Sequence, residues 1–341
     1  MGPRFGPHLR PDPARRRHHR CRLRGGAGGQ EPARLVPRRR ARHGRKERAD
    51  QRVPQLGVRD RGSQGGAVVT AVDKVIVTAV GTDLENNIAL VSEANLTAGA
   101  GEVVVEVEAA PVNGADTLFA MGWFGVYPEV PAAMGAEGVG RVVAVGSGVD
   151  AALLGRRVIM IPTFRFGTWA TRTVVPAANV VPVPEDADPL QLAMLAVNPA
   201  TAHVLLHEYV DLEPGDWIGL DLANSAVAHY LVPLAKRAGL AVLAVVRREA
   251  VVDEVKDLGA DIVLVDGEDL SARIADALAG ERLRVLFEGT GDPAQVARLV
   301  PAVADGGTVV AFASATGQTP AIPLADLIYR GIALRSVYIV G

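Results

Sequence analysis

The stretch that decides the fold runs from Trp217 to Arg248 and reads WIGLDLANSAVAHYLVPLAKRAGLAVLAVVRR. An apolar run, a turn of small residues, a helical stretch and a second apolar run follow one another in it. This order is typical of a βαβ unit whose helix N-terminus receives the diphosphate of a nucleotide. However, no glycine stands between Gly219 and Gly239, although glycine is the usual residue of such a turn.

The candidate diphosphate site is the turn made of Asn224, Ser225, Ala226, Val227 and Ala228. Alanine forced to a positive φ costs about 1–2 kcal/mol, but it costs little where the backbone stays right-handed. Ala226 and Ala228 are the smallest substitutes for glycine, and the Ser225 hydroxyl can cap the helix or bind phosphate. Pro233 lies inside the expected helix, where proline removes a hydrogen bond and kinks the helix or costs about 3 kcal/mol. The turn alone is therefore weak evidence of dinucleotide binding.

Two arginines, Arg247 and Arg248, end the second apolar run. NAD-specific sites carry an acidic residue at this position, where it binds the ribose hydroxyls. A pair of guanidinium groups suits the 2′-phosphate of NADP instead, so the sequence favours NADPH as the cofactor. The alternative is an ordinary solvated helix start, and it has about equal weight.

Residues 197–341 alternate strand-like runs with helical stretches. The expected strands are WIGLDLA, AVLAVVR, DIVLVD, RVLFEGT, GTVVAFAS and ALRSVYIVG. The expected helices lie near 226–238, 249–258, 269–279, 293–303 and 322–330. Continuous apolar strands separated by helices predict a doubly wound parallel sheet with both faces covered. We therefore expect an NADP-binding Rossmann domain of six strands over residues 197–341.

Residues 68–196 predict a β-rich domain. VDKVIVTAVG and GEVVVEVEAAPVN alternate apolar with polar or small residues, as half-buried strands do. Glycine and proline punctuate the short runs that come next in the chain, which is typical of a compact β barrel. The expected fold class is therefore α/β, with a β barrel followed by the Rossmann sheet.

Residues 1–67 differ from the rest of the chain, because they carry 18 Arg and one Lys against five acidic residues. They have no periodic apolar face, so we expect a disordered leader. Three interpretations of this leader are open. It could be an arm that binds nucleic acid through phosphates, a transit peptide, or sequence translated from upstream of the true start. The single lysine among so many arginines favours the third interpretation, and we expect no nucleic-acid partner.

The composition limits the class of protein. With 49% apolar and 22% charged residues, the chain is globular in type. No apolar run reaches the roughly 18 residues of a membrane span. The only cysteine, Cys21, excludes an internal disulfide and a cysteine-rich metal site. A cytoplasmic location fits these features.

Several motifs in a fixed order resemble the zinc-free branch of the medium-chain dehydrogenase/reductase superfamily. They are PVNGAD (111–116), PEVPAAMGAEGVGRVVAVGSGV (128–149), GTWAT (167–171), VNPATAHVLL (197–206) and LEPGDW (212–217). The likeness begins near residue 74 and is strongest to mitochondrial-type 2-enoyl thioester reductases, with quinone oxidoreductases next. It implies a GroES-like fold for the first domain, NADPH in the cleft, and hydride transfer to an activated C=C bond.

The same comparison argues against a metalloenzyme. Zinc-dependent members of the superfamily have a cysteine where Asn113 stands and a histidine where Ala136 stands. Catalytic zinc needs three protein ligands, and residues 68–341 contain no cysteine. We therefore expect no metal site.

The resemblance also suggests a catalytic tyrosine and asparagine. Enoyl reductases of this branch place a tyrosine before a pair of prolines, and an alignment on those prolines puts Phe124 there. Tyr127, three residues later, is the candidate proton donor, with packing on the barrel rim as its alternative. Asn113 resembles the asparagine that lies beside the nicotinamide.

The remaining site residues also come from the resemblance. Those expected near the nicotinamide are Thr201, Phe312, Ala313 and Ser314. Phe124 and Trp169 are expected to line the substrate cleft, and core packing is the alternative for Trp169.

The chain stops at the sixth expected strand, whereas the family continues and completes the β domain. We therefore expect an incomplete barrel, and a homodimer formed through the sixth strand as the resemblance implies. The expected function is NADPH-dependent, zinc-independent reduction of the C=C bond of a 2-enoyl thioester. The alternatives are a quinone or alkenal reductase, and a catalytically inactive nucleotide-binding or scaffold fragment.

Overall fold

The structure, a computed structural model, describes residues 71–314 and 317–338. The chain divides into two units, Met1–Gln64 and Gly65–Gly341. The leader expected over residues 1–67 lies outside the described residues, all of which belong to the second unit.

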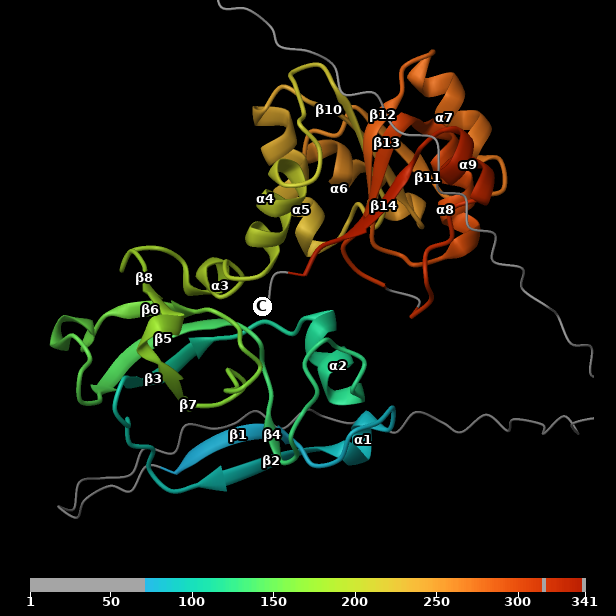
Figure 1. Ribbon diagram of the computed structural model, residues 1–341. Coiled ribbons are helices and arrows are strands. Elements are labelled where there is room, and N and C mark those ends of the chain that lie inside the picture. The colour runs from blue at the N-terminus through green and yellow to red at the C-terminus, as the bar shows by residue number, and fades with distance from the viewer. Residues whose placement is uncertain (1–70, 315–316, 339–341) are drawn as a thin grey trace, which may run out of the picture. The chain divides into compact units, whose positions relative to one another are not determined.

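The first half of this unit consists of two antiparallel sheets and small helices (Figure 1). Its strands are β1 (Val72–Val77), β2 (Ile88–Glu93), β3 (Glu102–Ala109), β4 (Ala132–Ala133), β5 (Gly138–Val145), β6 (Arg157–Met160), β7 (Arg172–Pro176) and β8 (Val180–Pro182). Its helices are α1 (Leu84–Asn87), α2 (Gly114–Met121) and α3 (Pro189–Leu192), with single 3₁₀ turns at Ala151–Leu153 and Ala177–Asn179. The sheets have the orders β2-β1-β4 and β7-β3-β5-β6-β8. The predicted β-rich fold is confirmed.

The alternating pattern of β3 explains the core of this half. Val103 and Val105 are fully buried and pack with Val142 and Val158 of the neighbouring strands. Helix α2 packs in a separate cluster, where Phe119 contacts the group around β1. Since the apolar side of α2 is fixed there, the position of its N-terminus is fixed as well.

The second half alternates helices with parallel strands. Its elements are α4 (Asn198–His207), β9 (Trp217–Leu220), α5 (Ala226–Arg237), β10 (Ala241–Val246), α6 (Val252–Asp257), β11 (Ile262–Val265), α7 (Leu270–Leu278), β12 (Leu283–Glu288), α8 (Pro293–Leu299), β13 (Val303–Ala311), α9 (Leu324–Tyr329) and β14 (Ala333–Ser336), with 3₁₀ turns at Glu249–Val251 and Val300–Ala302. The six strands pair in parallel in the order β11-β10-β9-β12-β13-β14. The order reverses between β9 and β12, so the predicted doubly wound sheet is confirmed.

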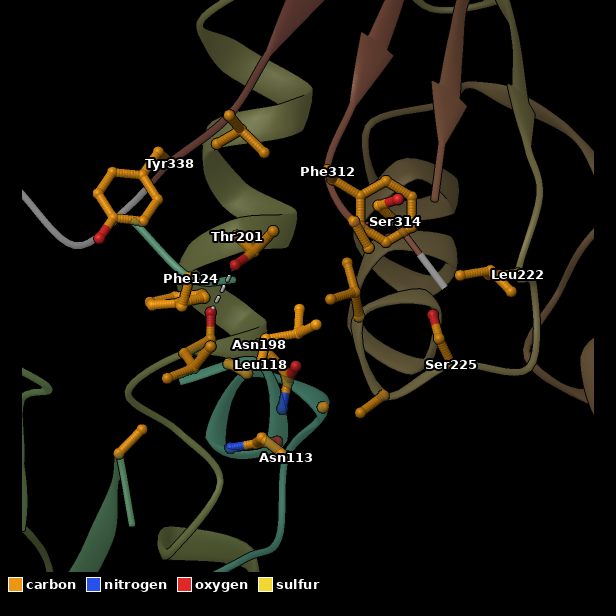
Figure 2. A pocket seen from close by; sticks show the side chains of 18 of the residues that line it. Asn113, Leu118, Phe124, Asn198, Thr201, Leu222, Ser225, Phe312, Ser314 and Tyr338 are labelled. Atoms are coloured by element: carbon orange, nitrogen blue, oxygen red, sulfur yellow. Dashed lines mark hydrogen bonds between the residues drawn. The ribbon is translucent and has the colours of Figure 1, made fainter. Parts of the chain in front are cut away.

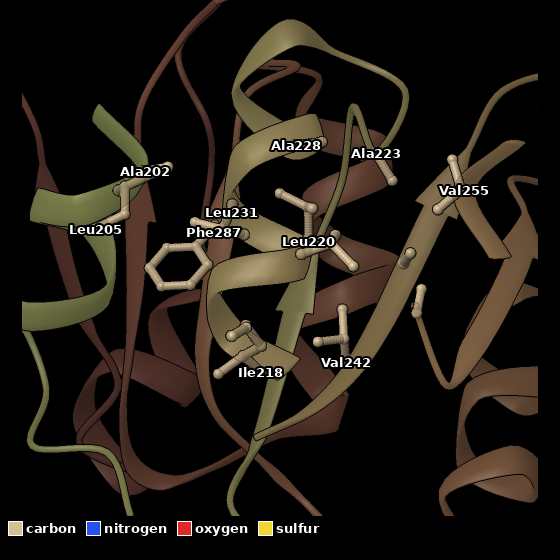
Figure 3. Close-up of a cluster of buried hydrophobic side chains, with 14 of the residues drawn as sticks. Ala202, Leu205, Ile218, Leu220, Ala223, Ala228, Leu231, Val242, Val255 and Phe287 are labelled. Atoms are coloured by element: carbon tan, nitrogen blue, oxygen red, sulfur yellow. The ribbon is translucent and has the colours of Figure 1, made fainter. Parts of the chain in front are cut away.

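Helices cover both faces of this sheet because neighbouring strand residues point to opposite sides. Ile218, Leu220 and Val242 pack with α4 and α5 on one face, as Figure 3 shows. Leu243 and Val245 pack with α7 and α8 on the other face. Since α4 shares the first of these clusters, it belongs with the Rossmann half. The domain boundary expected before residue 197 stays a prediction.

Helix α5 runs without interruption through Pro233. Proline has no N–H to donate, which costs the helix one hydrogen bond. Leu231, Val232 and Ala235 are fully buried on the same helix. Burial of this apolar face offsets the loss, because tertiary packing supplies most of the stability of a helix in a protein.

A buried pair of acids lies where the strand order reverses. Asp221 follows β9, Glu288 ends the adjacent β12, and both side chains are fully buried. Asp221 accepts hydrogen bonds from Gly289 N at 2.6 Å and Thr290 Oγ1 at 3.2 Å. Burial, and then the charge of Glu288, raises the pKa of Asp221 to about 8. Asp221 therefore holds a proton at neutral pH and joins the ends of the two strands as a neutral acid.

This protonation makes stability depend on pH. The folded chain holds a proton on Asp221 up to about pH 8, whereas the unfolded chain releases it near the ordinary value of 3.8. The free energy of unfolding should therefore fall as pH rises between these values. Asp221→Asn removes this contribution, so its melting temperature should exceed that of wild type at pH 8 by at least about 2 °C, the shift produced by roughly 1 kcal/mol.

Thermal unfolding followed by circular dichroism from pH 5 to pH 8 checks this prediction. Asp276→Asn, which changes an exposed acid on α7, is the matched control and should follow the wild-type curve. Parallel curves for wild type and Asp221→Asn would contradict a proton on Asp221.

Candidate active site

A cavity of about 480 Å³ draws its walls from both halves of the unit. The first half contributes the start of α2, Phe124 and Phe164. The second half contributes the first turn of α4, the turn before α5, the residues after β13, and Val337 with Tyr338. Figure 2 shows Asn113 and Ser225 entering this space from different elements. It therefore lies at the carboxyl edge of the parallel sheet, where such folds bind ligands.

The turn before α5 is open toward the cavity, although it lacks glycine. Ser225, Ala226 and Val227 line the cavity. Ser225 is the N-cap of α5, where its hydroxyl accepts a hydrogen bond from Ala228 N at 3.2 Å. Neither Ala226 nor Ala228 has a positive φ, whereas Leu222, two residues before this turn begins, has a φ of 45°. The helix tip thus reaches the cavity with no glycine, and the strained position precedes the turn.

Other residues of the expected cofactor site lie outside the cavity wall. Ala228 is fully buried in the core cluster under α5, and Asn224 is half-buried without lining the cavity. Arg247 and Arg248 follow β10 and are exposed. Neither arginine forms an ion pair with a described residue, so both guanidinium groups are available to an anion at the sheet edge.

A buried carboxylate connects the elements on either side of the cavity. Glu137 Oε1 accepts a hydrogen bond from Asn113 Nδ2 at 2.9 Å. Its Oε2 accepts from Ala196 N and Val197 N, both at 2.9 Å, at the entry to α4. The Glu137 side chain is fully buried, and this burial raises its pKa although the three donors oppose the shift.

A second buried acid fixes the start of α2. Asp116 accepts hydrogen bonds from Asn113 N and Ala136 N, both at 2.8 Å. Burial raises its pKa, although the two backbone donors oppose the shift. Asn113, the expected catalytic asparagine, is therefore held at both its backbone and its side chain.

The residues expected near the nicotinamide come together. Thr201, Phe312, Ala313 and Ser314 all line the cavity. Thr201 Oγ1 donates to Val197 O at 2.8 Å, and Ser314 Oγ donates to Gln318 O at 2.8 Å. Both hydroxyl hydrogens are thus used within the protein.

Phe124 and Tyr127, two of the three aromatic residues between 121 and 131, have different positions. Phe124 lines the cavity and packs on Phe164 with ring centroids 4.6 Å apart. Tyr127 is 67% exposed and does not line the cavity. Its side chain lies over Gly122, where a Cβ would come within 2.9 Å of its ring. The structure therefore does not bring Tyr127 to the site, and its role as proton donor stays a prediction.

Trp169 also lies outside the cavity wall. Its indole Nε1 donates to Pro111 O at 2.8 Å, and its ring packs in the cluster around α2. Core packing, the alternative expected for Trp169, describes this position, and a role in the substrate cleft stays a prediction.

Two polar residues of the cavity wall, Asn198 and Tyr338, were missed from the sequence. Asn198 opens α4, and its Nδ2 is buried without a hydrogen-bond partner among the described residues. Among the described residues of the cavity wall, Tyr338 alone has an ionisable side chain. Its ring packs against that of Phe124, with ring centroids 5.7 Å apart. Asn198 was part of the quoted NPATA motif, whereas Tyr338 had no local signal.

Three further observations concern metal ligands and membrane-spanning helices. Across residues 71–314 and 317–338, no three His, Cys, Asp or Glu side chains gather as a metal site would require. Ala136 and Asn113, at the positions of the zinc ligands in zinc-dependent relatives, both line the cavity. In the same described ranges, no helix has the length and apolar character that crossing a membrane requires.

Comparison with known proteins gives the chain its family. The model of the alcohol dehydrogenase GroES-like domain matches residues 99–185, and the model described as zinc-binding dehydrogenase matches residues 226–341. The mitochondrial enoyl-[acyl-carrier-protein] reductase of Rattus norvegicus is 33% identical over 72% of this chain and 66% of its own length. The corresponding protein of Dictyostelium discoideum is 31% identical over 70% of this chain and 69% of its own length. The chain thus spans about two thirds of the length of these relatives.

Solved structures show the same fold. A quinone oxidoreductase of Pseudomonas syringae has a TM-score of 0.70 at 26% identity and covers 78% of this chain and 81% of its own. A mitochondrial 2-enoyl thioester reductase heterodimer of Candida tropicalis has a TM-score of 0.68 at 22% identity and covers 79% and 82%. The chain belongs to the medium-chain dehydrogenase/reductase superfamily, on the zinc-free branch that contains the enoyl and quinone reductases.

Proposed function

We propose that the protein uses NADPH to reduce the activated C=C bond of a 2-enoyl thioester. The observation that carries this proposal is the division of the cavity. A helix tip with small residues stands on one side, at Ser225 and Ala226, and apolar side chains such as Leu118, Phe124 and Phe164 stand on the other. The helix tip suits an anionic diphosphate, and the apolar side suits an acyl group. The identity to enoyl reductases supports the same function.

The residues around the helix tip fit a dinucleotide. Ser225, Ala226 and Val227 would hold the diphosphate, since they line the cavity at the start of α5. Asn224 and Ala228, which lie outside the cavity wall, would support this turn. The exposed pair Arg247 and Arg248 would bind the 2′-phosphate. Thr201 and the segment Phe312–Ser314 would position the nicotinamide, which would supply hydride when bound. Asn113 would lie beside the nicotinamide.

A quinone or alkenal reductase is the second candidate. The cavity holds Phe124 where enoyl reductases of this branch have a tyrosine, and Tyr127 is outside it. Quinone reduction asks less of the protein in proton transfer, so this arrangement favours it. A catalytically inactive nucleotide-binding or scaffold fragment is the third candidate, and the lack of glycine in the turn before α5 favours it.

The second half also presents a surface for self-association. Strand β14 is the edge of the six-stranded sheet, and Leu334 on it is exposed, as are Ile328 and Tyr329 on α9. An exposed apolar edge strand is a ready partner for a second strand. A homodimer through β14 is therefore part of the proposal. The enoyl reductase relatives are mitochondrial, so the cytoplasmic location stays a prediction.

Cofactor and substrate can be tested on the full chain. Titration should enhance NADPH fluorescence saturably, with a dissociation constant between roughly 1 μM and 1 mM. Oxidation of NADPH, followed by absorbance, should be faster with a crotonyl thioester than with naphthoquinone. Faster oxidation with the quinone would select the second candidate, and no saturable binding would remove both reductase proposals.

A variant pair controls the cofactor assignment. Replacing Arg247 and Arg248 together by alanine should raise the dissociation constant of NADPH by about tenfold, or about 1.4 kcal/mol, and leave that of NADH unchanged. Arg237→Ala, at the far end of α5, is the matched control and should change neither constant. An equal rise for both cofactors would contradict a 2′-phosphate site at these arginines.

The source of the proton can be tested with the two tyrosines. Tyr338 is in the cavity wall and Tyr127 is not, so Tyr338→Phe should lower enoyl turnover by about 10²-fold or more, the loss expected of a general acid. Tyr127→Phe should stay within about twofold of wild type. Steady-state kinetics at saturating NADPH checks both. The reverse pattern would restore Tyr127 as the donor.

A further inference from the structure

Three of the six described polar side chains in the cavity wall donate hydrogen bonds within the protein. Thr201 Oγ1 donates to Val197 O, and Ser314 Oγ donates to Gln318 O. Asn113 Nδ2 donates to Glu137. A ligand oxygen that enters the apolar side therefore finds few free donors.

Of the other three polar side chains, which belong to Asn198, Ser225 and Tyr338, only that of Asn198 is buried. Its side chain is only 7% exposed, and its Nδ2 has no hydrogen-bond partner among the described residues. Figure 2 shows it at the end of α4 that approaches α2, beside Leu118 and Asn113. A buried amide left without a hydrogen-bond partner destabilises the folded protein. Such a cost persists in a protein when a ligand supplies the missing partner.

The helix itself adds to the same site. Asn198 is the first residue of α4, and no described side chain caps this end. The first turn of a helix carries a partial positive charge that stabilises a nearby anion. The segment just before it is held in place, because Ala196 N and Val197 N are fixed by Glu137. A fixed donor and a fixed dipole thus meet at Asn198.

We propose that the Asn198 amide, together with the N-terminal end of α4, binds the carbonyl oxygen of the substrate. This inference rests on the proposed function. When hydride adds to the β-carbon, the π electrons of the C=C bond move and the carbonyl oxygen takes the negative charge of an enolate. Proton transfer to the α-carbon, from water or from Tyr338, then restores the C=O bond. Asn198 Nδ2–H stabilises the oxygen while its charge is largest, as a preorganised donor can do.

Asn198→Ala tests the assignment. The variant should lower kcat for a crotonyl thioester by about 10²- to 10³-fold, the loss expected on removing one such donor. Its dissociation constant for NADPH should stay within about threefold of wild type, which also shows that the chain is folded. Asn86→Ala, which changes an exposed asparagine of α1, is the matched control and should keep wild-type kinetics.

A second variant changes only the donor. Asn198→Asp keeps the shape of the side chain but replaces the amide by a carboxyl, which donates only while protonated. Its kcat should therefore rise as the pH falls, whereas the kcat of Asn198→Ala should show no such rise. A carboxyl variant with the same pH profile as wild type would overturn the proposal.

An infrared measurement gives a readout that needs no turnover. With oxidised NADP in place of NADPH, a bound crotonyl thioester cannot be reduced, and its C=O stretching band reports hydrogen bonding to the oxygen. The band should lie below its frequency in water with wild type and return toward that frequency with Asn198→Ala. The same band in both proteins would overturn the proposal.

The remaining outcomes separate this inference from the proposed function. A weaker NADPH affinity of Asn198→Ala with unchanged kcat would assign the amide to the cofactor and overturn the proposal. Lower thermal stability of Asn198→Ala with unchanged kcat would give the Asn198 amide a structural role only, and would overturn the proposal as well. A wild-type chain that reduces neither an enoyl thioester nor a quinone would overturn the proposed function and this inference together.

Discussion

The fully buried carboxylate of Glu137 is the interaction on which the candidate site depends. Its oxygens receive hydrogen bonds from Asn113 Nδ2 on one side and from Ala196 N and Val197 N on the other. Burial of a charged group is unfavourable unless such partners compensate it. The three donors provide this compensation, and in doing so they set the distance between the start of α2 and the entry to α4.

The two halves of the unit divide the chemistry of the cavity. The parallel sheet brings the tip of α5 and the end of β13 to one edge, because all its strands end there with the same polarity. The first half adds Phe124 and Phe164, which make the opposite wall apolar. A hydrogen bond to a substrate oxygen has a greater effect beside such an apolar wall than in water.

Burial explains which parts of the fold and of the candidate site could be predicted from the sequence. The central strands β9 and β10 are apolar because both of their faces are covered, so they were predicted from their composition. The edge strand β14 is mostly exposed and contains Arg335. The backbone at Ala226 and Ala228 stays right-handed, as a turn without glycine requires, and the diphosphate site there stays a prediction. The position of the positive φ, at Leu222, had no such signal in the sequence.

Contacts between distant segments explain the residues that were missed or misplaced. Tyr338 packs on Phe124 across more than two hundred positions of sequence, and no local pattern encodes such a contact. Tyr127 lies three residues from Phe124, but the loop places one side chain inside the cavity and the other outside. Asn198 stood in a motif that was recognised, yet the absence of a partner for its amide results only from the packing around it.

The transfer of deuterium from NADPH labelled at C4 of the nicotinamide tests the central claim most directly. The account predicts that a crotonyl thioester reduced by this protein carries one deuterium on its β-carbon, which mass spectrometry and NMR detect. A reduced product without deuterium, or with the label on the carbonyl carbon, would contradict it.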